Sequence, residues 1–432
     1  MASELSVLLR RLALPIYLPT VLYASGASAI VPVLPLIGLD LGLSVTQVAL
    51  LSTVAGLVVV VGPLPTGQLV ARIGERAALV IGGLVSIASI VACLIAARAG
   101  TPGAVPAWAA PLFCAGILVM SLGDLTWDLG RQTYLADEVP AHLRARAMTL
   151  FGGMMRVGRI LGPLVGAAVI ATAGASAAFI VHLVAAVVSL TLIVAFVAPY
   201  ATASMSVTGD ADEPAPARSD ILRPLLLVGL AVLVLTVART NRDLLLPLLG
   251  NAYGHSGATV SLVFAVAAVV ELAFILPAGT LMDRFGRAAV LVPCLALMGV
   301  GFLLAGQAAT LPGFVGISLV FAVGNGLGAG INKTLSADMT PARNRASWLG
   351  LWNSLTNAGA LVGPAMVAAA SGVAGVVTAS IATGWTSIAG AAWAAWWLPR
   401  ILPGAARLSL RRTADRPGRR QSLSSRRKPG SR

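Results

Sequence analysis

Twelve long apolar runs, separated by short polar gaps, constrain what this chain can fold into. Each run is about 22 to 29 residues long, enough for an α-helix to cross the hydrocarbon core of a bilayer. Lipid offers no partners to backbone N–H and C=O groups, so such runs must form helices. We therefore predict an all-α, polytopic membrane protein. The runs lie at about 12–38, 44–70, 77–98, 106–134, 146–172, 175–198, 222–249, 257–282, 288–309, 312–336, 346–370 and 373–398.

A polar segment rich in Ala, Pro and Ser divides these runs into two sets of six. Such a segment cannot bury a core, which indicates a linker. We predict an N-terminal six-helix bundle at 1–198, a cytoplasmic linker at 199–221 and a C-terminal six-helix bundle at 222–398. The remaining residues, 399–432, are basic and of low complexity, and we expect a disordered cytoplasmic tail.

The net charge of +14 is distributed unevenly. Most of the excess follows Arg400, and the rest lies in the gaps after even-numbered runs. Positive residues gather on the cytoplasmic side of membrane proteins, so both termini are predicted to be cytoplasmic. High Ala, Gly and Arg usage suggests a bacterial genome and hence the bacterial cytoplasmic membrane. We expect membrane lipids to be partners of the tail and nucleic acid not to be a partner.

The two sets of runs are related in sequence. Ala136–Pro140 corresponds to Ala337–Pro341, and the same offset then aligns Gly158 with Gly359 and Gly162-Pro163 with Gly363-Pro364. A constant offset over some thirty residues, matched charged loops included, indicates duplication of a six-helix unit.

The gap after the eighth run reads AGTLMDRFGR and contains Gly279, Asp283, Arg284, Gly286 and Arg287. This resembles the loop signature of the major facilitator superfamily of secondary transporters, most of all its bacterial drug/proton antiporter-type members. The resemblance covers residues 12–398. It implies two bundles around a central cavity that opens to each side in turn, with this loop as a conformational latch. A simple topology loop is the alternative, and both roles are compatible.

The first-half copy of the loop departs from the signature. Ala71 replaces the aspartate, and Glu75 takes an arginine position. A latch there should be weaker or should use Glu75. In the second half we expect Asp283 to face the start of the fifth run, near Arg146.

The fifth run carries three glycines, each four residues after the last, and a proline beside the second of them: Gly158, Gly162, Pro163 and Gly166. Glycines at this spacing form a seam where another helix can approach closely. The pattern resembles the fifth-helix motif of antiporters in the superfamily and so favours export. Generic small-residue packing is the alternative, which the echo at Gly359 and Gly363 supports.

Charges inside the runs are the sharpest functional signal, because each costs several kcal/mol unless paired or hydrated. The fourth run holds Asp124, Asp128 and Arg131, which share one helix face. The fifth holds Arg156 and Arg159. We predict an Asp124–Arg156 interaction, with Asp128 available to Arg159 or to Arg131. The network serves proton coupling or, alternatively, fixes packing as static ion pairs.

Glu271 lies alone near the middle of the eighth run and is a second candidate proton carrier, or else a hydrogen-bonded neutral acid in the packing. In the seventh run Arg239 and Arg242 are candidate partners for it, although a position at the rim of the cavity is favoured. Further candidates for the cavity wall are Tyr23, Asn325, Asn353 and Asn357, with hydrogen bonding between helices as the alternative. His182 is interpreted as a packing residue.

No catalytic constellation, phosphate-binding loop or metal-ligand spacing is visible, so we expect no enzyme activity, no catalytic residue, no cofactor and no metal. The expected partners are a small-molecule substrate and protons, and we expect a monomer. Three functions stay open. The first is a proton-coupled exporter of drug-like or apolar compounds, and the second an uptake permease for a nutrient or anionic metabolite. The third is a transport-dead sensor or assembly partner.

Overall fold

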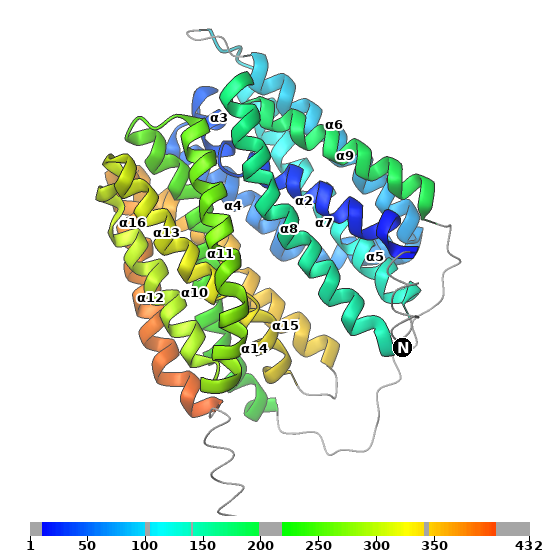
Figure 1. Cartoon of the computed structure of the whole chain (residues 1–432), viewed down its shortest axis with the longest axis vertical. Helices are drawn as coiled ribbons and strands as arrows, with labels where there is room; N and C mark the ends of the chain where they lie inside the picture. The colour runs from blue at the N-terminus through cyan, green and yellow to red at the C-terminus, as the bar shows by residue number, and fades with distance from the viewer. Residues whose placement is uncertain (1–10, 100–103, 140, 198–217, 341–344, 403–432) are drawn as a thin grey trace, which may run out of the picture.

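The computed structural model describes residues 11–99, 104–139, 141–197, 218–340 and 345–402, and all of its regular elements are helices. The N-terminal half contains η1 (Ala13–Tyr17), α2 (Leu18–Ile30), α3 (Leu34–Asp40), α4 (Val45–Val61), α5 (Pro63–Ile73), α6 (Glu75–Ala99), α7 (Ala109–Glu138), α8 (Ala141–Ala173) and α9 (Ala177–Phe196). The C-terminal half contains α10 (Arg218–Ala252), α11 (Gly257–Phe285), α12 (Ala288–Leu303), η2 (Ala305–Ala309), α13 (Leu311–Leu327), α14 (Ile331–Met339), α15 (Arg345–Asn357) and α16 (Gly359–Ile401). Figure 1 shows the two halves as neighbouring bundles.

These helices match the twelve predicted runs. Within the described residues nine helical segments are long and apolar enough to cross a membrane, and the bent pair α4–α5 makes a tenth. The shorter apolar helix α12 occupies the ninth run, and one 54-residue segment contains both the eleventh and the twelfth. The linker and the basic tail fall almost wholly outside the described residues, although α10 begins at Arg218 and α16 continues to Ile401.

The long segment is a hairpin rather than one rod. Its backbone leaves the helical region at Ala374 and at Gly375, whose φ of +81° suits glycine. The Thr386 hydroxyl lies 3.7 Å from the sulfur of Met366, twenty residues earlier. Twenty residues of straight helix would separate these groups by about 30 Å, so the chain must reverse between them.

The first two predicted runs are broken where the sequence predicted continuous helices. The break between α2 and α3 coincides with Pro32 and precedes Pro35, and proline removes a helical hydrogen bond and clashes with the preceding turn. Between α4 and α5 the axis bends by 53° at Gly62 and Pro63. Proline at the first position of α5 starts a new helix instead of continuing the old one.

The two halves meet along two helix pairs, α4 with α16 and α8 with α11. A shared apolar core joins them at the ends of these pairs near the α3–α4 turn, where Val48 and Ala49 pack among Leu244–Leu249 and Val367. Near the middle, Gly56 lies directly against the backbone of Ala360. We call the end of the molecule at the α3–α4 turn, which holds this shared core, the opposite face.

The other end, which we call the basic face, carries Arg72, Arg76, Arg284 and Arg287. Here each half has an apolar core of its own, one around Trp127 and Phe151 and the other around Trp352 and Leu291. The halves are therefore packed together at the opposite face and separate towards the basic face (Figure 1).

The predicted glycine seam of the fifth run is used for close helix packing. Gly158 and Gly162 of α8 face the backbone of α2 at Val21 and Ser25, and Gly166 faces Ala29. In the second half Gly359 and Gly363 bring α16 against α10 in the same way. Both copies of the duplicated unit thus use the seam to join a pair of helices within one half.

We predict that Gly162→Ala lowers stability by about 1–3 kcal/mol, as an overpacked site does. A Cβ there would lie 2.7 Å from the Ser28 hydroxyl and 2.9 Å from the Ala29 nitrogen. Gly153→Ala is the matched control, because a Cβ at Gly153 on the same helix meets nothing within 4 Å. Thermal unfolding in detergent should show a lower Tm for the first variant only. Equal Tm values would contradict the tight seam.

Candidate functional site

A cavity of about 470 Å³ lies between the two halves, bounded by α2, α7 and α8 on one side and by α10, α11 and α13 on the other. Five arginines and four carboxylates line it, an unusual density of charge for the interior of a membrane protein. The cationic set is Arg131, Arg156, Arg159, Arg239 and Arg242, and the acidic set is Asp124, Asp128, Asp243 and Glu271.

Arg131 is the most enclosed of these charges, with 1% of its surface exposed. It forms a salt bridge with Asp128 three residues earlier on α7, as predicted, and its NH1 group lies 3.4 Å from the Thr20 hydroxyl. Its guanidinium also lies over the rings of Tyr23, Trp127 and Phe151, each at 5.6–5.7 Å from the ring centroid. The ion pair and the cation–π contacts together offset the free-energy cost of burying this charge.

Asp124 makes its contacts with neutral hydroxyl groups. Tyr23 donates a short hydrogen bond to its Oδ1 atom, and Ser86 of α6 donates a second at 3.3 Å. The predicted Asp124–Arg156 pair is therefore wrong. Gly82 and Gly123 let α6 and α7 pack closely, which brings Ser86 next to Asp124. Arg156 extends instead towards the C-terminal half, where its guanidinium lies 3.9 Å from the position that a Cβ atom would occupy at Gly330.

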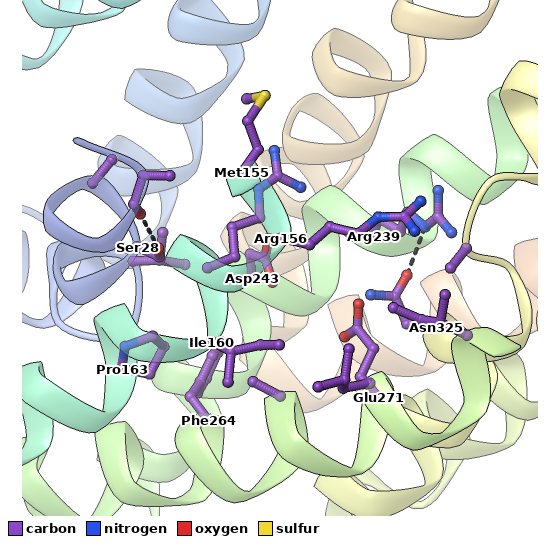
Figure 2. A pocket seen from close by; sticks show the side chains of 18 of the residues that line it. Ser28, Met155, Arg156, Ile160, Pro163, Arg239, Asp243, Phe264, Glu271 and Asn325 are labelled. Atoms are coloured by element: carbon purple, nitrogen blue, oxygen red, sulfur yellow. Dashed lines mark hydrogen bonds between the residues drawn. The ribbon is translucent and has the colours of Figure 1, made fainter. Parts of the chain in front are cut away.

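The predicted contact of Asp128 with Arg159 is also absent among the described residues, because Asp128 is taken by Arg131. Arg156 and Arg159 make no hydrogen bond or ion pair within the described chain, and both side chains are exposed to the cavity. Figure 2 shows Arg156 from one half and Arg239 from the other directed into the same space.

In the C-terminal half Arg242 forms a salt bridge of 3.4 Å with Glu271 and lies over the ring of Phe264 at 5.7 Å. The Nε of Arg239 donates to Asn325 Oδ1 at 2.6 Å (Figure 2). The expectation that these arginines sit at the rim is wrong: both line the cavity, and Arg242 is 7% exposed. Helix α10 runs on to Ala252, more than two turns further, which places them deep in the molecule.

Of the predicted wall residues, Tyr23, Arg239 and Asn325 line the cavity, whereas Asn353 and Asn357 do not. The neighbouring Trp352 is buried and donates to Asn332 at 2.8 Å, whereas Asn353 is exposed and does not line the cavity. Sequence reasoning did not select Asp243 or Ser86. Asp243 follows Arg239 by one helical turn, a spacing that indicates a shared face.

A model of the Major Facilitator Superfamily matches the sequence over residues 16–241 and again over 228–429. The chain belongs to the major facilitator superfamily. It is thus a secondary transporter with this family's two-bundle fold, and not an enzyme.

Solved structures of other transporters are similar in fold. One is a POT family transporter in complex with a thioalcohol-conjugated peptide, with a TM-score of 0.74 and 11% identity, covering 91% of this chain and 97% of that one. A D-xylose–proton symporter has a TM-score of 0.69 at 17% identity, over 91% and 99% of the two chains. The human organic anion transporter MFSD10 has a TM-score of 0.60 at 17% identity, over 89% and 99%. No curated protein gave a significant sequence match.

The signature loop of this superfamily member turns at Gly286, where φ is +89°, and the first-half copy turns at Gly74, where φ is +82°. Arg287 forms a salt bridge of 2.8 Å with Asp338 at the end of α14. This hydrogen-bonded contact raises the pKa of the Arg287 guanidinium above its ordinary value. Both partners belong to the C-terminal half. The predicted contact of Asp283 with Arg146 lies outside the described residues, because the Arg146 side chain is not placed.

His182 packs as the sequence analysis expected. It is fully buried, and its ring meets that of Tyr23 edge-on at 5.1 Å. Both ring nitrogens lack a hydrogen-bond partner in the described structure, which is typical of a packing residue rather than of a relay. No group of three His, Cys, Asp or Glu side chains suited to a metal occurs in the described part of the chain.

The five cavity arginines thus divide into structural and available groups. We predict that Arg131→Gln lowers stability by about 2–4 kcal/mol, because it leaves Asp128 without its cation and removes the contacts with three aromatic rings. Arg156→Gln should leave stability unchanged, because this side chain has no protein partner to lose. Thermal unfolding of both purified variants checks the difference, and similar losses would show that Arg156 also holds the fold together.

Proposed function

We propose that this secondary transporter carries a small organic molecule with an anionic group, by alternating access and at the expense of a proton gradient. One observation carries the proposal. Three guanidinium groups, those of Arg156, Arg159 and Arg239, face one cavity without a salt-bridge partner among the described residues. An unpaired cation inside a membrane protein is costly, which points to a function for it.

Guanidinium groups suit such a substrate. Their planar donors match the oxygens of a carboxylate or phosphate and form charge-assisted hydrogen bonds about twice as strong as neutral ones. Arg156 and Arg239 come from opposite halves, so one anionic group held between them would contact both bundles (Figure 2). A substrate that bridges the halves is suited to controlling their relative motion.

The rest of the cavity wall supports an organic substrate rather than an inorganic ion. Between the charges lie Ile160, Phe264, Leu272 and Ile275, which offer an apolar surface. Ligand sites generally combine apolar walls with a few well-placed polar groups. We therefore infer a substrate with a hydrocarbon or ring portion beside its acidic group.

Cations also lie towards the basic face. Lys333 of α14 is the only lysine among the described residues. Its side chain extends to α8, where Nζ lies 3.9 Å from the position that a Cβ atom would occupy at Gly152. With Arg156 close to Gly330, each half extends one cation towards the other. Such a series attracts anions into the cavity by long-range electrostatics.

Proton-coupled export of drug-like or apolar compounds is the second candidate. The fifth-helix motif favours it, although the same seam in the C-terminal half gives the motif a packing role as well. Everted membrane vesicles energised by respiration distinguish the two. Substrate-dependent proton release from the vesicles would support export.

We predict that Arg156→Gln and Arg159→Gln each weaken binding of the transported anion about ten- to hundredfold, the effect of one lost hydrogen bond to a charged group. The measurement is binding and uptake of a panel of organic acids by the purified protein in nanodiscs and proteoliposomes. Arg76→Gln is the control, because Arg76 donates to the Val194 carbonyl outside the cavity. Preference of the wild type for neutral or cationic compounds would overturn the proposal.

A further inference from the structure

The four carboxylates of the cavity differ in what they contact. Asp128 is paired with Arg131, and Glu271 with Arg242. Asp243 lies among Arg242, Arg159 and Arg239, which act on it electrostatically. Asp124 alone receives its hydrogen bonds from neutral groups, the hydroxyls of Tyr23 and Ser86. Protonation of the other three would sacrifice an ion pair or the attraction of three arginines, whereas protonated Asp124 keeps both hydrogen bonds and gives up only the attraction of Arg131, with which it forms no salt bridge.

The groups around Asp124 are held in place. Tyr23 is 4% exposed, stacks on Trp127 with ring centroids 5.0 Å apart, and meets His182 edge-on. Ser86 is fully buried on α6. Since packing fixes both hydroxyls, the pocket for the Asp124 carboxyl is formed in advance, while Asp124 itself still borders the cavity.

The charged, titratable and hydrogen-bonding groups around this carboxyl come from α7 itself and from six other elements, α2, α6, α8, α9, α10 and α11. Its two nearest elements contribute Tyr23 from α2 and the hydroxyl of Ser86 from α6. Further away stand Asp128 and Arg131 on α7 and His182 on α9, which meets Tyr23. Across the cavity stand Arg156, Arg159, Arg239, Arg242, Asp243 and Glu271.

We propose that Asp124 is the site that binds the transported proton, and that proton and substrate anion bind to the cavity cooperatively. The inference rests on the proposed function. A hydronium ion transfers a proton to Asp124: one O–H bond of the hydronium ion breaks, one O–H bond of the carboxyl forms, and a water molecule is released. The proton occupies Oδ2, and the carbonyl oxygen Oδ1 of the neutral carboxyl continues to accept from the hydroxyls of both Tyr23 and Ser86.

The charge of the cavity sets the sign of this coupling. With every group ionised, five arginines face four carboxylates, an excess of one positive charge, and protonation of Asp124 raises the excess to two. A more positive cavity binds an anion more tightly, and by linkage the bound anion favours protonation. Proton and anion therefore cross together. Exchange of an anion against a proton would require the opposite sign, in which the two compete.

The test uses the full-length protein in nanodiscs and proteoliposomes, with the best organic acid from the substrate panel as the probe. Wild-type binding of the acid should tighten several-fold between pH 8 and pH 6. Asp124→Asn, which mimics the neutral carboxyl, should bind as tightly at pH 8 as the wild type does at pH 6. It should retain exchange of substrate across the membrane and lose accumulation driven by a proton gradient. Asp40→Asn, a change of an exposed carboxylate at the end of α3 and outside the cavity, is the control and should behave as the wild type.

Tyr23→Phe gives a second readout should Asp124→Asn not fold. The ring and its packing remain, but the donor that stabilises the ionised carboxylate is lost, so a proton binds Asp124 at lower proton concentration. The pH midpoint of substrate binding should move to higher pH. A merely structural role for Tyr23 would lower stability without moving this midpoint.

The possible failures are distinguishable. If the wild type binds no organic acid, the proposed function fails. If it does, but Asp124→Asn keeps proton-driven accumulation, or Tyr23→Phe leaves the midpoint in place, the assignment of Asp124 is wrong. If the acid binds more weakly as the pH falls from 8 to 6, cooperative binding is overturned in favour of exchange.

Discussion

An ionised group in the hydrocarbon region must find a counter-charge, a hydrogen bond or water, and this constraint organises the molecule. The described charges of the membrane interior gather around one cavity between the halves. The two most enclosed cations, Arg131 and Arg242, are each paired with a carboxylate and covered by aromatic rings. Because these two are satisfied within their own halves, they can remain in place while the halves move. The cations without a carboxylate partner, Arg156, Arg159 and Arg239, line the cavity, where water or a substrate can reach them.

Glycine makes this arrangement possible by letting helices approach closely. Gly158 and Gly162 allow α8 to pack tightly on α2, the helix whose Tyr23 donates to Asp124 of α7. With its glycines against α2, α8 directs Arg156 and Arg159 into the cavity. Gly359 and Gly363 do the same for α16 and α10, the helix of Arg239 and Arg242. A glycine pattern that resembles a signature of transport direction is thus also a requirement of packing. The duplication of the unit reveals this, because a motif specific to direction has no reason to recur in the partner half.

The fold was readable from the sequence because helix length in lipid is fixed by bilayer thickness, and twelve runs of that length leave little choice. The breaks at Pro32 and Gly62 and the reversal at Gly375 required knowledge of backbone geometry. Charged residues of the site were also found from the sequence, since few charges occur in apolar runs. Their partners were found only in part: the Asp128–Arg131 pair and the candidate Arg242–Glu271 pair form, whereas the partners of Asp124 were missed. Helix depth placed Asp124 level with Arg156, but Asp124 instead accepts hydrogen bonds from Tyr23 of α2 and Ser86 of α6. Rotation of a helix by one residue, about 100°, changes which neighbour a side chain meets, and no pattern in one sequence determines it.

The separation of the halves at the basic face bears on how binding drives the transport cycle. In the described conformation the halves share an apolar core only at the opposite face, and Arg156, Arg159 and Lys333 lie on the open side of it. Closing the basic face would bring cations from both halves together and remove their water, which is unfavourable without a counter-charge. The proposed anionic substrate would supply that charge between the halves, and it would then lower the free energy of the closed state relative to the open one. A ligand shifts a conformational equilibrium only by its differential affinity for the two states, and this arrangement of unpaired arginines provides such a difference.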